Sequence, residues 1–397
     1  MHRRTFSQLL ALGSGGWLAL QQTNAEAKEE DPRSGEAQVP WSQPPITIED
    51  FIPLAQAKLP RATFEYVTHG SEDQITLREN VEAFRRLRLL PPLLHGVNKT
   101  SLETMVLGQK IALPVILAPV AALRMYHPEG GRAAARAAAK AGTICVPSTS
   151  AGNSLEEIRA AAGGPLWFQL YVPSDRQIAR RLVERAERSG YKAIVVTVDL
   201  GERKDADLRN GFAPPREMLL KSLRDVGHTD LPDDISMDDL LEFNNNAWEL
   251  SLNPDFFRWL RGATRLPILI KGVLSPEAAL QAIDLGLDGI VVSNHGGRRL
   301  DGMPATIDVL RDVAEAVDGR VEVLLDGGIR RGSDILKAIA FGAKAVLIGR
   351  PQAWALAAGG QAGVQHAIEI LRDELTNAMI ASGCRTVAEV RPELVMA

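Results

Sequence analysis

Eight short apolar runs, each closed by a polar or glycine-rich turn, constrain the fold of this chain more than any other feature. Segments with helical spacing, rich in alanine, leucine and arginine, lie between most of them, for example residues 129–141, 174–189 and 276–285. Strands that alternate with helices at roughly thirty-residue spacing predict an α/β fold, the (β/α)8 TIM barrel, whose active site lies at the carboxyl ends of the strands. The runs are residues 113–118, 143–147, 166–170, 193–198, 267–271, 289–293, 321–326 and 345–349.

The main alternative to a barrel is an open, doubly wound sheet. That fold would carry a dinucleotide-binding Gly-x-Gly-x-x-Gly turn after its first strand, and the sequence has none there. A chain of 397 residues with 45% hydrophobic residues and no break in composition can bury one large core. We therefore expect one barrel domain over residues 46–397. An N-terminal helical segment should begin near Thr47 and Asp50, which resemble a capping box, and its first helix should end at Pro60.

One connection is much longer than the others. Roughly seventy residues separate the fourth run from the fifth, and they include the acidic, asparagine-rich stretch 229–246. A loop of this length in a compact domain is usually a lid or a disordered segment. Because it follows the fourth strand, we predict a lid over the carboxyl face of the barrel.

The first 45 residues differ from the rest of the chain. Arg3 and Arg4 precede a mildly apolar stretch over 9–20 and small residues at 25–27, which predicts a twin-arginine export signal over residues 1–27 and a periplasmic protein. A stray basic terminus on a short helix is the alternative. Residues 28–45, rich in charge and proline, are expected to be a disordered leader. No other apolar run reaches the ~20 residues that a membrane span requires.

The charge and cysteine content argue against several other classes of protein. A net charge of −4 with both signs intermixed gives no basic stripe for a nucleic acid. Cys145 and Cys384 are the only cysteines, and their positions indicate neither a disulfide framework nor a metal site.

Polar side chains follow the strands at the predicted active-site face. Gln169 and Tyr171 close the third strand, and Thr197 and Asp199 close the fourth. Each could singly be a structural cap, but their convergence on one mouth predicts a site.

The sixth strand leads into a loop that contains a proton acceptor. In this loop His295 stands three residues before Arg298, with two glycines between them that let the backbone approach a ligand. This spacing places a base beside a cation suited to a carboxylate.

The last two strands predict a phosphate site. Asp326-Gly327-Gly328-Ile329-Arg330 and Gly349-Arg350 supply backbone N–H groups and two guanidinium groups where barrels commonly bind phosphate. A lone Gly-Gly pair would indicate only a loop. Together with Gly-Arg one strand later, it predicts a phosphate-bearing cofactor.

Residues 291–301, Val-Val-Ser-Asn-His-Gly-Gly-Arg-Arg-Leu-Asp, resemble the active-site signature of the FMN-dependent L-2-hydroxy-acid oxidases and dehydrogenases. This is the family of glycolate oxidase, lactate oxidase and mandelate dehydrogenase, and the resemblance extends over about residues 46–389. It implies that His295 is the catalytic base, Asp199 its orienting carboxylate, Arg298 the main clamp on the substrate carboxylate and Tyr171 a donor to substrate. Lys271 would stabilise the reduced flavin.

The same resemblance implies FMN as the cofactor. Its phosphate would lie on Asp326 to Arg330 and on Gly349 and Arg350. The residues implied to hold the flavin ring are Pro119, Val120, Ala121, Ser148, Gln169, Thr197, Lys271 and Ser293.

Three positions depart from the family pattern. Phe64 stands where we place the family's first substrate tyrosine, and Lys204, with Arg203 beside it, stands in place of a lid arginine. Lysine does not replace a bidentate arginine, so either Lys204 or Arg203 could contact the substrate. Ser150 replaces a tryptophan that narrows the glycolate oxidase pocket, which favours larger 2-hydroxy acids unless Trp248 of the lid fills the space.

We therefore expect oxidation of an L-2-hydroxy acid to the 2-oxo acid, with electrons passed from FMN to oxygen. The same half-reaction with a quinone or another carrier is the near alternative, and a non-catalytic FMN- or phosphate-binding barrel is the distant one. The retained base argues against the distant alternative. Family members are commonly tetramers or larger, so a homotetramer or a larger homo-oligomer is expected.

Overall fold

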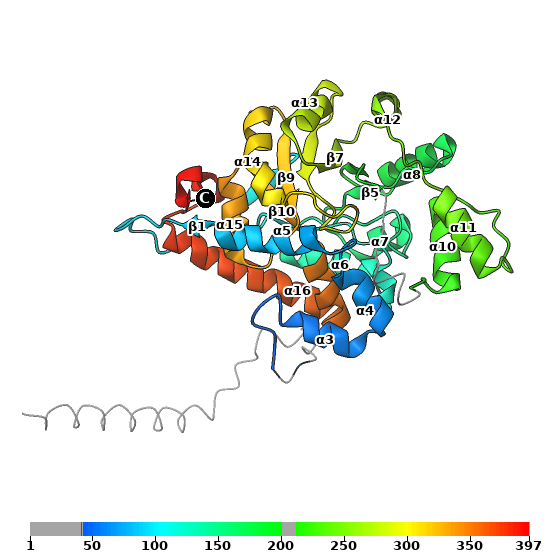
Figure 1. The fold of residues 1–397 in the computed structure, drawn as a ribbon, viewed down its shortest axis with the longest axis horizontal. Coiled ribbons are helices and arrows are strands. Elements are labelled where there is room, and N and C mark those ends of the chain that lie inside the picture. The colour runs from blue at the N-terminus through cyan, green and yellow to red at the C-terminus, as the bar shows by residue number, and fades with distance from the viewer. Residues whose placement is uncertain (1–40, 42, 201–211, 397) are drawn as a thin grey trace, which may run out of the picture. The chain divides into compact units, whose positions relative to one another are not determined.

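The computed structural model describes residues 41, 43–200 and 212–396 (Figure 1). The predicted export signal and residues 28–40 of the predicted leader lie outside the described residues. Where the leader ends, the prediction is wrong: Trp41 packs edge-on against Phe51 at 5.7 Å between ring centroids, and the Pro45 carbonyl accepts a hydrogen bond from His366. An aromatic ring packed against the buried Phe51 adds apolar contact, so the folded domain begins five residues earlier than predicted, at Trp41.

Seven parallel strands form the central sheet, which is curled and covered by helices (Figure 1). Each coincides with one of the predicted apolar runs. In spatial order the strands are β4 (Val115–Leu117), β10 (Ala345–Ile348), β9 (Glu322–Asp326), β8 (Gly289–Val292), β7 (Ile268–Val273), β6 (Ile194–Thr197) and β5 (Phe168–Leu170).

The predicted run 143–147 does not form a regular strand, but it joins the two edges of this sheet. Cys145 makes parallel bridges to Leu117 at the end of β4 and to Leu166 before β5. Val146 N donates to Leu117 O at 3.0 Å. Pro147 has no N–H to donate, which explains why the ladder here is broken into isolated bridges.

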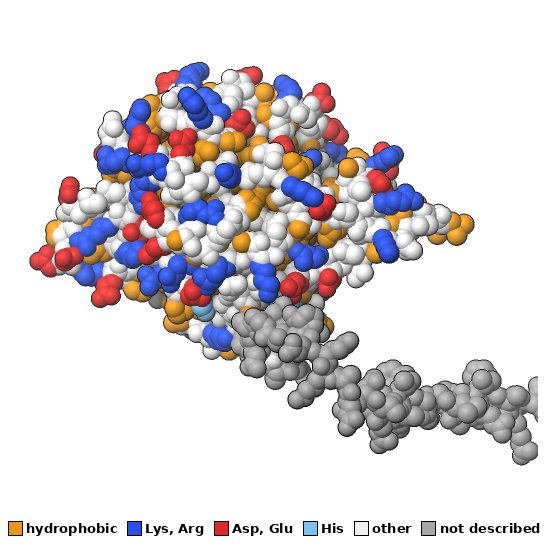
Figure 2. Space-filling model, turned by 180° about the vertical axis from the view of Figure 1, so that it is seen from behind, with side chains coloured by type: hydrophobic (Ala, Val, Ile, Leu, Met, Phe, Trp, Pro, Cys, Tyr) orange, Lys and Arg blue, Asp and Glu red, His pale blue; other side chains and the backbone are white. Residues whose placement is uncertain are grey.

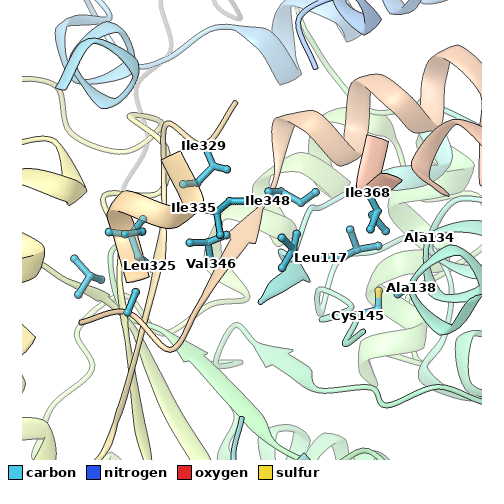
Figure 3. Packing of buried hydrophobic residues seen from close by; sticks show 14 of the residues in the cluster. Leu117, Ala134, Ala138, Cys145, Leu325, Ile329, Ile335, Val346, Ile348 and Ile368 are labelled. Atoms are coloured by element: carbon cyan, nitrogen blue, oxygen red, sulfur yellow. The ribbon is translucent and has the colours of Figure 1, made fainter. Parts of the chain in front are cut away.

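Alternate strand residues belong to two separate apolar clusters. Ile116, Val291 and Leu347 belong to a small cluster on one face of the sheet. Their sequence neighbours belong to the main core, which packs the other face against the helices; Figure 3 shows Leu117 and Val346 within it. A period of two with both faces buried is what a parallel sheet inside a shell of helices requires.

The helices that flank the sheet lie close to their predicted positions. The N-terminal segment begins with reciprocal hydrogen bonds between Thr47 and Asp50, so the predicted capping pair is confirmed. The helices outside the long insertion are α3 (Phe51–Lys58), α4 (Arg61–Thr68), α5 (Ile75–Arg86), α6 (Gly131–Ala141), α7 (Leu155–Ala161), α8 (Arg176–Arg188), α13 (Pro276–Asp284), α14 (Thr306–Val317), α15 (Gly332–Ala340) and α16 (Arg350–Ala381).

The long insertion after β6 is not a structureless loop. It contains α10 (Arg216–Val226), α11 (Met237–Asn246) and α12 (Pro254–Ala263). Leu219, Leu223 and Leu240 form a small core of their own between α10 and α11. The acidic, asparagine-rich composition obscured the leucine spacing that allows these helices to pack.

Two short antiparallel pairs lie outside the central sheet. They are β1 (Arg88–Leu89) with β11 (Val395–Met396), and β2 (Thr104–Val106) with β3 (Gln109–Ile111). On the face seen in Figure 2, acidic and basic side chains are intermixed. Among the described residues, no helix combines the length and hydrophobicity needed to cross a bilayer, and no group of three His, Cys, Asp or Glu side chains is arranged to hold a metal ion.

Candidate active site

A cavity of about 710 Å³ opens at the carboxyl ends of the strands. Residues from the first strand end, from the His295 loop and from the last two strand ends all line it. The predicted convergence of these segments on one volume is therefore what the structure shows. The long insertion lines the cavity as well, through Leu200 and Phe212 before α10 and through Trp248 after α11.

Three successive left-handed residues form the turn that carries His295. The φ angles are +56° at His295, +65° at Gly296 and +71° at Gly297. A Cβ at Gly297 would lie 2.6 Å from the Leu77 backbone nitrogen, so only glycine allows this close approach. Ser71 N donates to Gly297 O at 2.8 Å. The N-terminal segment therefore holds the loop in place from outside the barrel.

A buried pair of amides adds to this support. Asn80 and Asn294 exchange two hydrogen bonds, at 2.9 and 2.8 Å, and both are almost fully buried. Asn294 Oδ1 also accepts from Gly297 N at 3.2 Å, and Asn80 Oδ1 accepts from Thr306 N. Asn80 on α5 thus positions the base loop although it stands more than 200 residues away in sequence.

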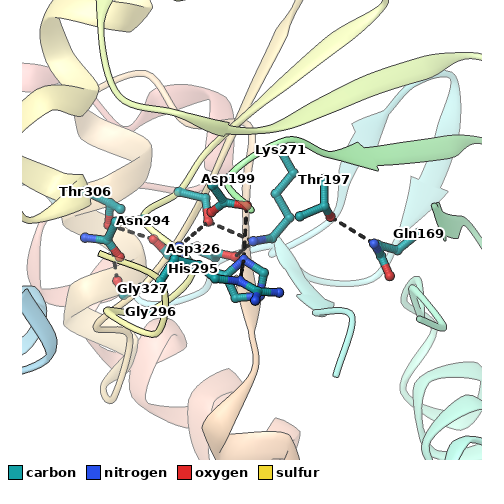
Figure 4. A network of polar contacts seen from close by, with 12 residues as sticks. Gln169, Thr197, Asp199, Lys271, Asn294, His295, Gly296, Thr306, Asp326 and Gly327 are labelled. Atoms are coloured by element: carbon teal, nitrogen blue, oxygen red, sulfur yellow. Dashed lines mark hydrogen bonds and ion pairs between the residues drawn. The ribbon is translucent and has the colours of Figure 1, made fainter. Parts of the chain in front are cut away.

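His295 and Asp199 form the predicted pair of base and carboxylate. His295 Nδ1 lies 3.0 Å from Asp199 Oδ1 (Figure 4). Tyr171 Oη lies 3.4 Å from His295 Nε2. Burial lowers the pKa of His295 to about 3, with Arg299 and Lys271 acting in the same direction and Asp199 against them. The imidazole is therefore neutral at physiological pH, with Nε2 directed toward Tyr171.

Asp199 itself stays ionised. Burial would raise the pKa of Asp199, but its interaction with His295, including the hydrogen bond from Nδ1, and the positive charges of Lys271 and Arg299 lower it below its usual range. A carboxylate held as an anion at Nδ1 fixes the imidazole tautomer and stabilises the imidazolium that a proton transfer would create.

Lys271 is a buried cation with two partners. Its ammonium group lies 3.0 Å from Asp326 Oδ2 and donates to Ser293 Oγ at 2.8 Å. Burial opposes its charge, but Asp326 and Asp199 raise the pKa of Lys271 above the usual value. It therefore supplies a permanent positive charge at the floor of the cavity.

Arg298 faces the cavity, as predicted, but its aromatic neighbour was assigned to the wrong residue. Phe64 is buried in the main core and does not line the cavity. Tyr66, two residues later on α4, does line it; the Arg298 guanidinium lies 4.8 Å from its ring centroid, and its ring stacks on Phe212. Phe64 and Val67 both belong to the buried face of α4. Their spacing of three residues on a helix is the sequence signal that could have assigned Phe64 to the core.

Sequence reasoning also missed Arg299. Its Nη2 donates to Tyr171 Oη at 3.0 Å and it lines the cavity. Arg298 was assigned to the substrate carboxylate and its neighbour Arg299 was given no role, because residue type alone does not show which of two adjacent arginines points into a cavity. Arg203 and Lys204, which were also predicted to contact the substrate, lie outside the described residues.

The residues predicted for the flavin ring fall into two layers. Pro119, Val120, Ala121, Thr197 and Lys271 line the cavity. Ser148, Gln169 and Ser293 are buried and do not line it. Gln169 donates to Thr197 at 3.0 Å and accepts from Ser148 at 2.9 Å, so these two hold a lining residue in place (Figure 4).

The predicted phosphate loop, residues 326–330 with Gly349 and Arg350, lines the cavity throughout. A Cβ at Gly328, where φ is +83°, would lie 1.9 Å from Asn80 O, which explains the need for glycine. Arg350 donates to the backbone carbonyls of Val67, Gly296 and His69. It therefore also ties the N-terminal segment to the base loop.

The electrostatics of this corner fit a bound phosphate. Burial lowers the pKa of Arg330 to about 10. Burial and the charges of Arg298 and Arg330 lower the pKa of Arg350 well below its usual value. An anion placed among these guanidinium groups would relieve both effects. Asp326 Oδ1 is buried without a hydrogen-bond partner within the described part of the chain, which suits a hydroxyl-bearing ligand chain.

A curled parallel sheet with a base, a cation suited to a carboxylate and a predicted phosphate loop around one cavity is the arrangement expected of a flavin-dependent α/β oxidoreductase. Comparison with known proteins gives the family. The profile of the FMN-dependent dehydrogenase family matches residues 55–397. The chain belongs to this family, and FMN is its cofactor.

Its relatives are similar along almost their whole length. Human 2-hydroxyacid oxidase 1 is 44% identical over 356 residues, which cover 88% of this chain and 96% of that protein. Glycolate oxidase of Spinacia oleracea is 44% identical over 348 residues, covering 86% and 93%. The solved structure of mandelate oxidase with (S)-4-hydroxymandelic acid is 40% identical with a TM-score of 0.82, covering 89% and 98%.

Proposed function

We propose that this protein oxidises an L-2-hydroxy acid to the corresponding 2-oxo acid and passes the electrons through FMN to oxygen. The observation that carries the proposal is the neutral His295, paired with Asp199, in the same cavity as Arg298 and the phosphate arginines. Similarity to enzymes named 2-hydroxyacid oxidase and glycolate oxidase supports it. A barrel that only bound FMN or phosphate would gain nothing from a histidine kept ready to accept a proton.

The residues of this chain divide the work between binding and proton transfer. Arg298 would hold the substrate carboxylate through charge-assisted hydrogen bonds and so orient the hydroxyl-bearing carbon. His295 Nε2 would accept the proton, and Asp199 would stabilise the imidazolium that results. FMN, when bound, takes up the two electrons of the oxidation and delivers them to oxygen. The proton can leave from carbon, or from the hydroxyl group with hydride transfer. In both mechanisms His295 Nε2 would accept one proton.

The proposal includes a closed eight-stranded barrel with residues 199–266 as a lid. The bridges from Cys145 to both edges of the sheet support closure. The cavity-lining residues Met218 and Leu223 of α10 support the lid.

The side chains that line the cavity around Ser150 and α10 also bear on the size of the substrate. Ser150 lines the cavity, as do the apolar side chains of α10. Trp248 also lines it, with its ring centroid 6.1 Å from that of Tyr171. We propose that an aliphatic or aromatic group on the substrate packs between these side chains, which favours larger 2-hydroxy acids over glycolate, since each buried methylene contributes about 0.8 kcal/mol.

Anaerobic flavin bleaching tests the proposed reaction. The FMN-loaded protein is mixed with glycolate, L-lactate, L-2-hydroxyoctanoate or L-mandelate, with the D-enantiomers of the chiral acids as controls, and air is then admitted. We expect bleaching by the L-acids and, less efficiently, by the achiral glycolate, no bleaching by the D-enantiomers, and rapid return of colour in air. Failure of every L-acid to bleach the flavin would refute the proposal. Bleaching that persists in air but is reversed by a quinone would assign the electrons to a carrier instead of oxygen.

Two further proposals concern the whole protein. Residues 1–27 are proposed to be a twin-arginine export signal, so protein recovered from the periplasm of an expressing bacterium should begin at or near Lys28 by intact mass. An uncleaved terminus in that fraction would contradict this. We also propose a homotetramer, and light scattering of the FMN-loaded protein tests it, with a monomeric mass as the contrary result.

A further inference from the structure

Arg299 contacts both side chains that surround the proposed site of proton transfer. It follows Arg298 in the base loop and is half-buried. Its Nη2 donates to Tyr171 Oη at 3.0 Å, and its Nε lies 3.5 Å from His295 Nδ1. The guanidinium carbon lies 5.8 Å from the centroid of the Tyr171 ring. One cation therefore touches the phenol on one side and the imidazole on the other.

The contact with Tyr171 restricts where the phenol can donate its hydrogen. A phenolic oxygen carries one hydrogen and accepts through its lone pairs. Because the oxygen accepts from Arg299, its own hydrogen must point away from the guanidinium. His295 Nε2 lies 3.4 Å from this oxygen and, with the Nδ1 hydrogen donated to Asp199, can accept the phenolic hydrogen. Arg299 thus orients the Tyr171 hydroxyl toward the space in which a substrate hydroxyl would meet the base.

The contact with His295 is electrostatic. Nδ1 faces Asp199 Oδ1 at 3.0 Å, so the Nδ1 hydrogen is donated to the carboxylate and Arg299 acts on the ring as a nearby positive charge. From the described elements packed around it, the ring is faced by Asp199 after β6, Lys271 on β7, Tyr171 after β5 and Arg299 of its own loop. Asp199 favours the imidazolium, whereas the two cations and burial oppose it.

We propose that Arg299 is a positioning residue that orients the Tyr171 hydroxyl and disfavours the imidazolium form of His295 until an anionic substrate enters. The inference rests on the proposed oxidation and adds a residue to it. A substrate carboxylate on Arg298 brings a negative charge beside Arg299 and offsets it. The imidazole then becomes more basic at the stage at which it must accept the proton. Arg299 acts through Tyr171 and His295 and need not contact the substrate.

Two substitutions separate the charge from the hydrogen bond. Arg299→Gln removes the charge, and Arg299→Lys keeps it but loses the Nη2 group that reaches Tyr171. The measurement is the rate of anaerobic flavin reduction by an L-2-hydroxy acid as a function of pH. We expect the acid limb of the Gln profile to move to higher pH by about one unit. The Lys profile should keep the wild-type limb, with a plateau about tenfold lower because one hydrogen bond is lost.

The Tyr171→Phe background tests whether the lower plateau of Arg299→Lys arises through the Tyr171 hydroxyl. If Arg299 acts through the phenol, Arg299→Lys should have no further effect in this background, because the two residues share one interaction. Equal tenfold losses in both backgrounds would overturn the orienting role.

A second readout does not depend on turnover. The chain has seven histidines, and comparison with His295→Gln identifies the His295 ring signal in a ¹³C-histidine NMR spectrum. We expect this signal to titrate at higher pH in Arg299→Gln than in the wild type and in Arg299→Lys. Arg311→Gln is the matched control, since Arg311 stacks on Phe341 at 4.2 Å and does not line the cavity.

The outcomes distinguish this inference from the proposed function. The role of the charge would be overturned if an Arg299→Gln protein with wild-type FMN content and Tm kept the wild-type acid limb of flavin reduction and the wild-type titration of the His295 ring. If Arg299→Gln loses FMN or unfolds, the charge is tested with Arg299→Lys, for which a shifted limb or titration would contradict it. A wild-type protein whose flavin no L-acid bleaches would refute the proposed oxidation instead.

Discussion

Replacing Asp199 by asparagine should slow the proton transfer without disturbing the shape of the site. The carboxylate lies 3.0 Å from His295 Nδ1. At an effective dielectric constant of about 20, two unit charges at that distance interact by about 5.5 kcal/mol. An asparagine oxygen can still accept from Nδ1–H, so we expect roughly half of this stabilisation of the imidazolium to be lost. About 3 kcal/mol corresponds to a flavin reduction about 10²-fold slower.

The pH dependence of that variant has a definite sign. Asp199 raises the pKa of His295 against burial and the two cations, so its removal lowers that pKa further. His295 remains unprotonated, and raising the pH cannot restore the rate. Anaerobic stopped-flow bleaching measures this, with Asp318→Asn as control because Asp318 lies in an exposed left-handed turn that suits asparagine. A rate within about threefold of wild type, or recovery at high pH, would refute the reasoning.

Three further predictions concern binding. Arg350→Lys should weaken FMN binding by roughly 1.5–3 kcal/mol, measured as the FMN dissociation constant, because a charge-assisted contact is lost; an unchanged constant would remove Arg350 from the phosphate site. Tyr66→Phe should raise the KM of small acids, whereas Phe64→Tyr should mainly lower Tm by burying a hydroxyl without a known partner; the reverse pattern would restore Phe64 to the site. Ser150→Trp should reduce kcat/KM for L-mandelate more than for glycolate, and equal losses would contradict the proposed pocket.

The fold was predictable because the strands of this chain are buried on both faces. Continuous apolar runs such as 289–293 and 345–349 leave little choice except a parallel sheet enclosed by helices, and both form strands. A strand was predicted at 143–147 on the same apolar pattern, but this run forms only isolated bridges. Pro147 has no N–H to donate, so a continuous ladder cannot form there. The helices of the long insertion escaped prediction because their leucines pack on one another instead of on the main core.

The chemistry of the site was predictable where a residue type is required by its role. His295, Asp199 and Lys271 lie together as expected, because a base, its carboxylate and a buried cation were identified at successive strand ends. Tyr66 and Arg299 were missed for a different reason. Their roles depend on which way a helix face and a loop side chain point, and a pattern of residue types along the chain does not fix those directions.

Support from distant segments was the least predictable part. Asn80 holds the base loop through Asn294, and its carbonyl lies where a Cβ of Gly328 would be. The Gly-Gly motif indicated a phosphate loop. The structure shows a second requirement for glycine at Gly328, because the backbone of α5 passes close to this position. No local sequence pattern predicts a contact between residues so far apart in the chain.

The central claim is that His295 is the base in the oxidation of a 2-hydroxy acid, and one comparison tests it directly. Wild-type protein and His295→Gln, both loaded with FMN, are mixed anaerobically with the best L-2-hydroxy acid while flavin absorbance is followed. Binding of oxalate, measured separately, checks that the Arg298 site is intact. We predict that the variant keeps FMN, binds oxalate and bleaches about 10²–10⁴ times more slowly. Bleaching at near wild-type speed would contradict the claim.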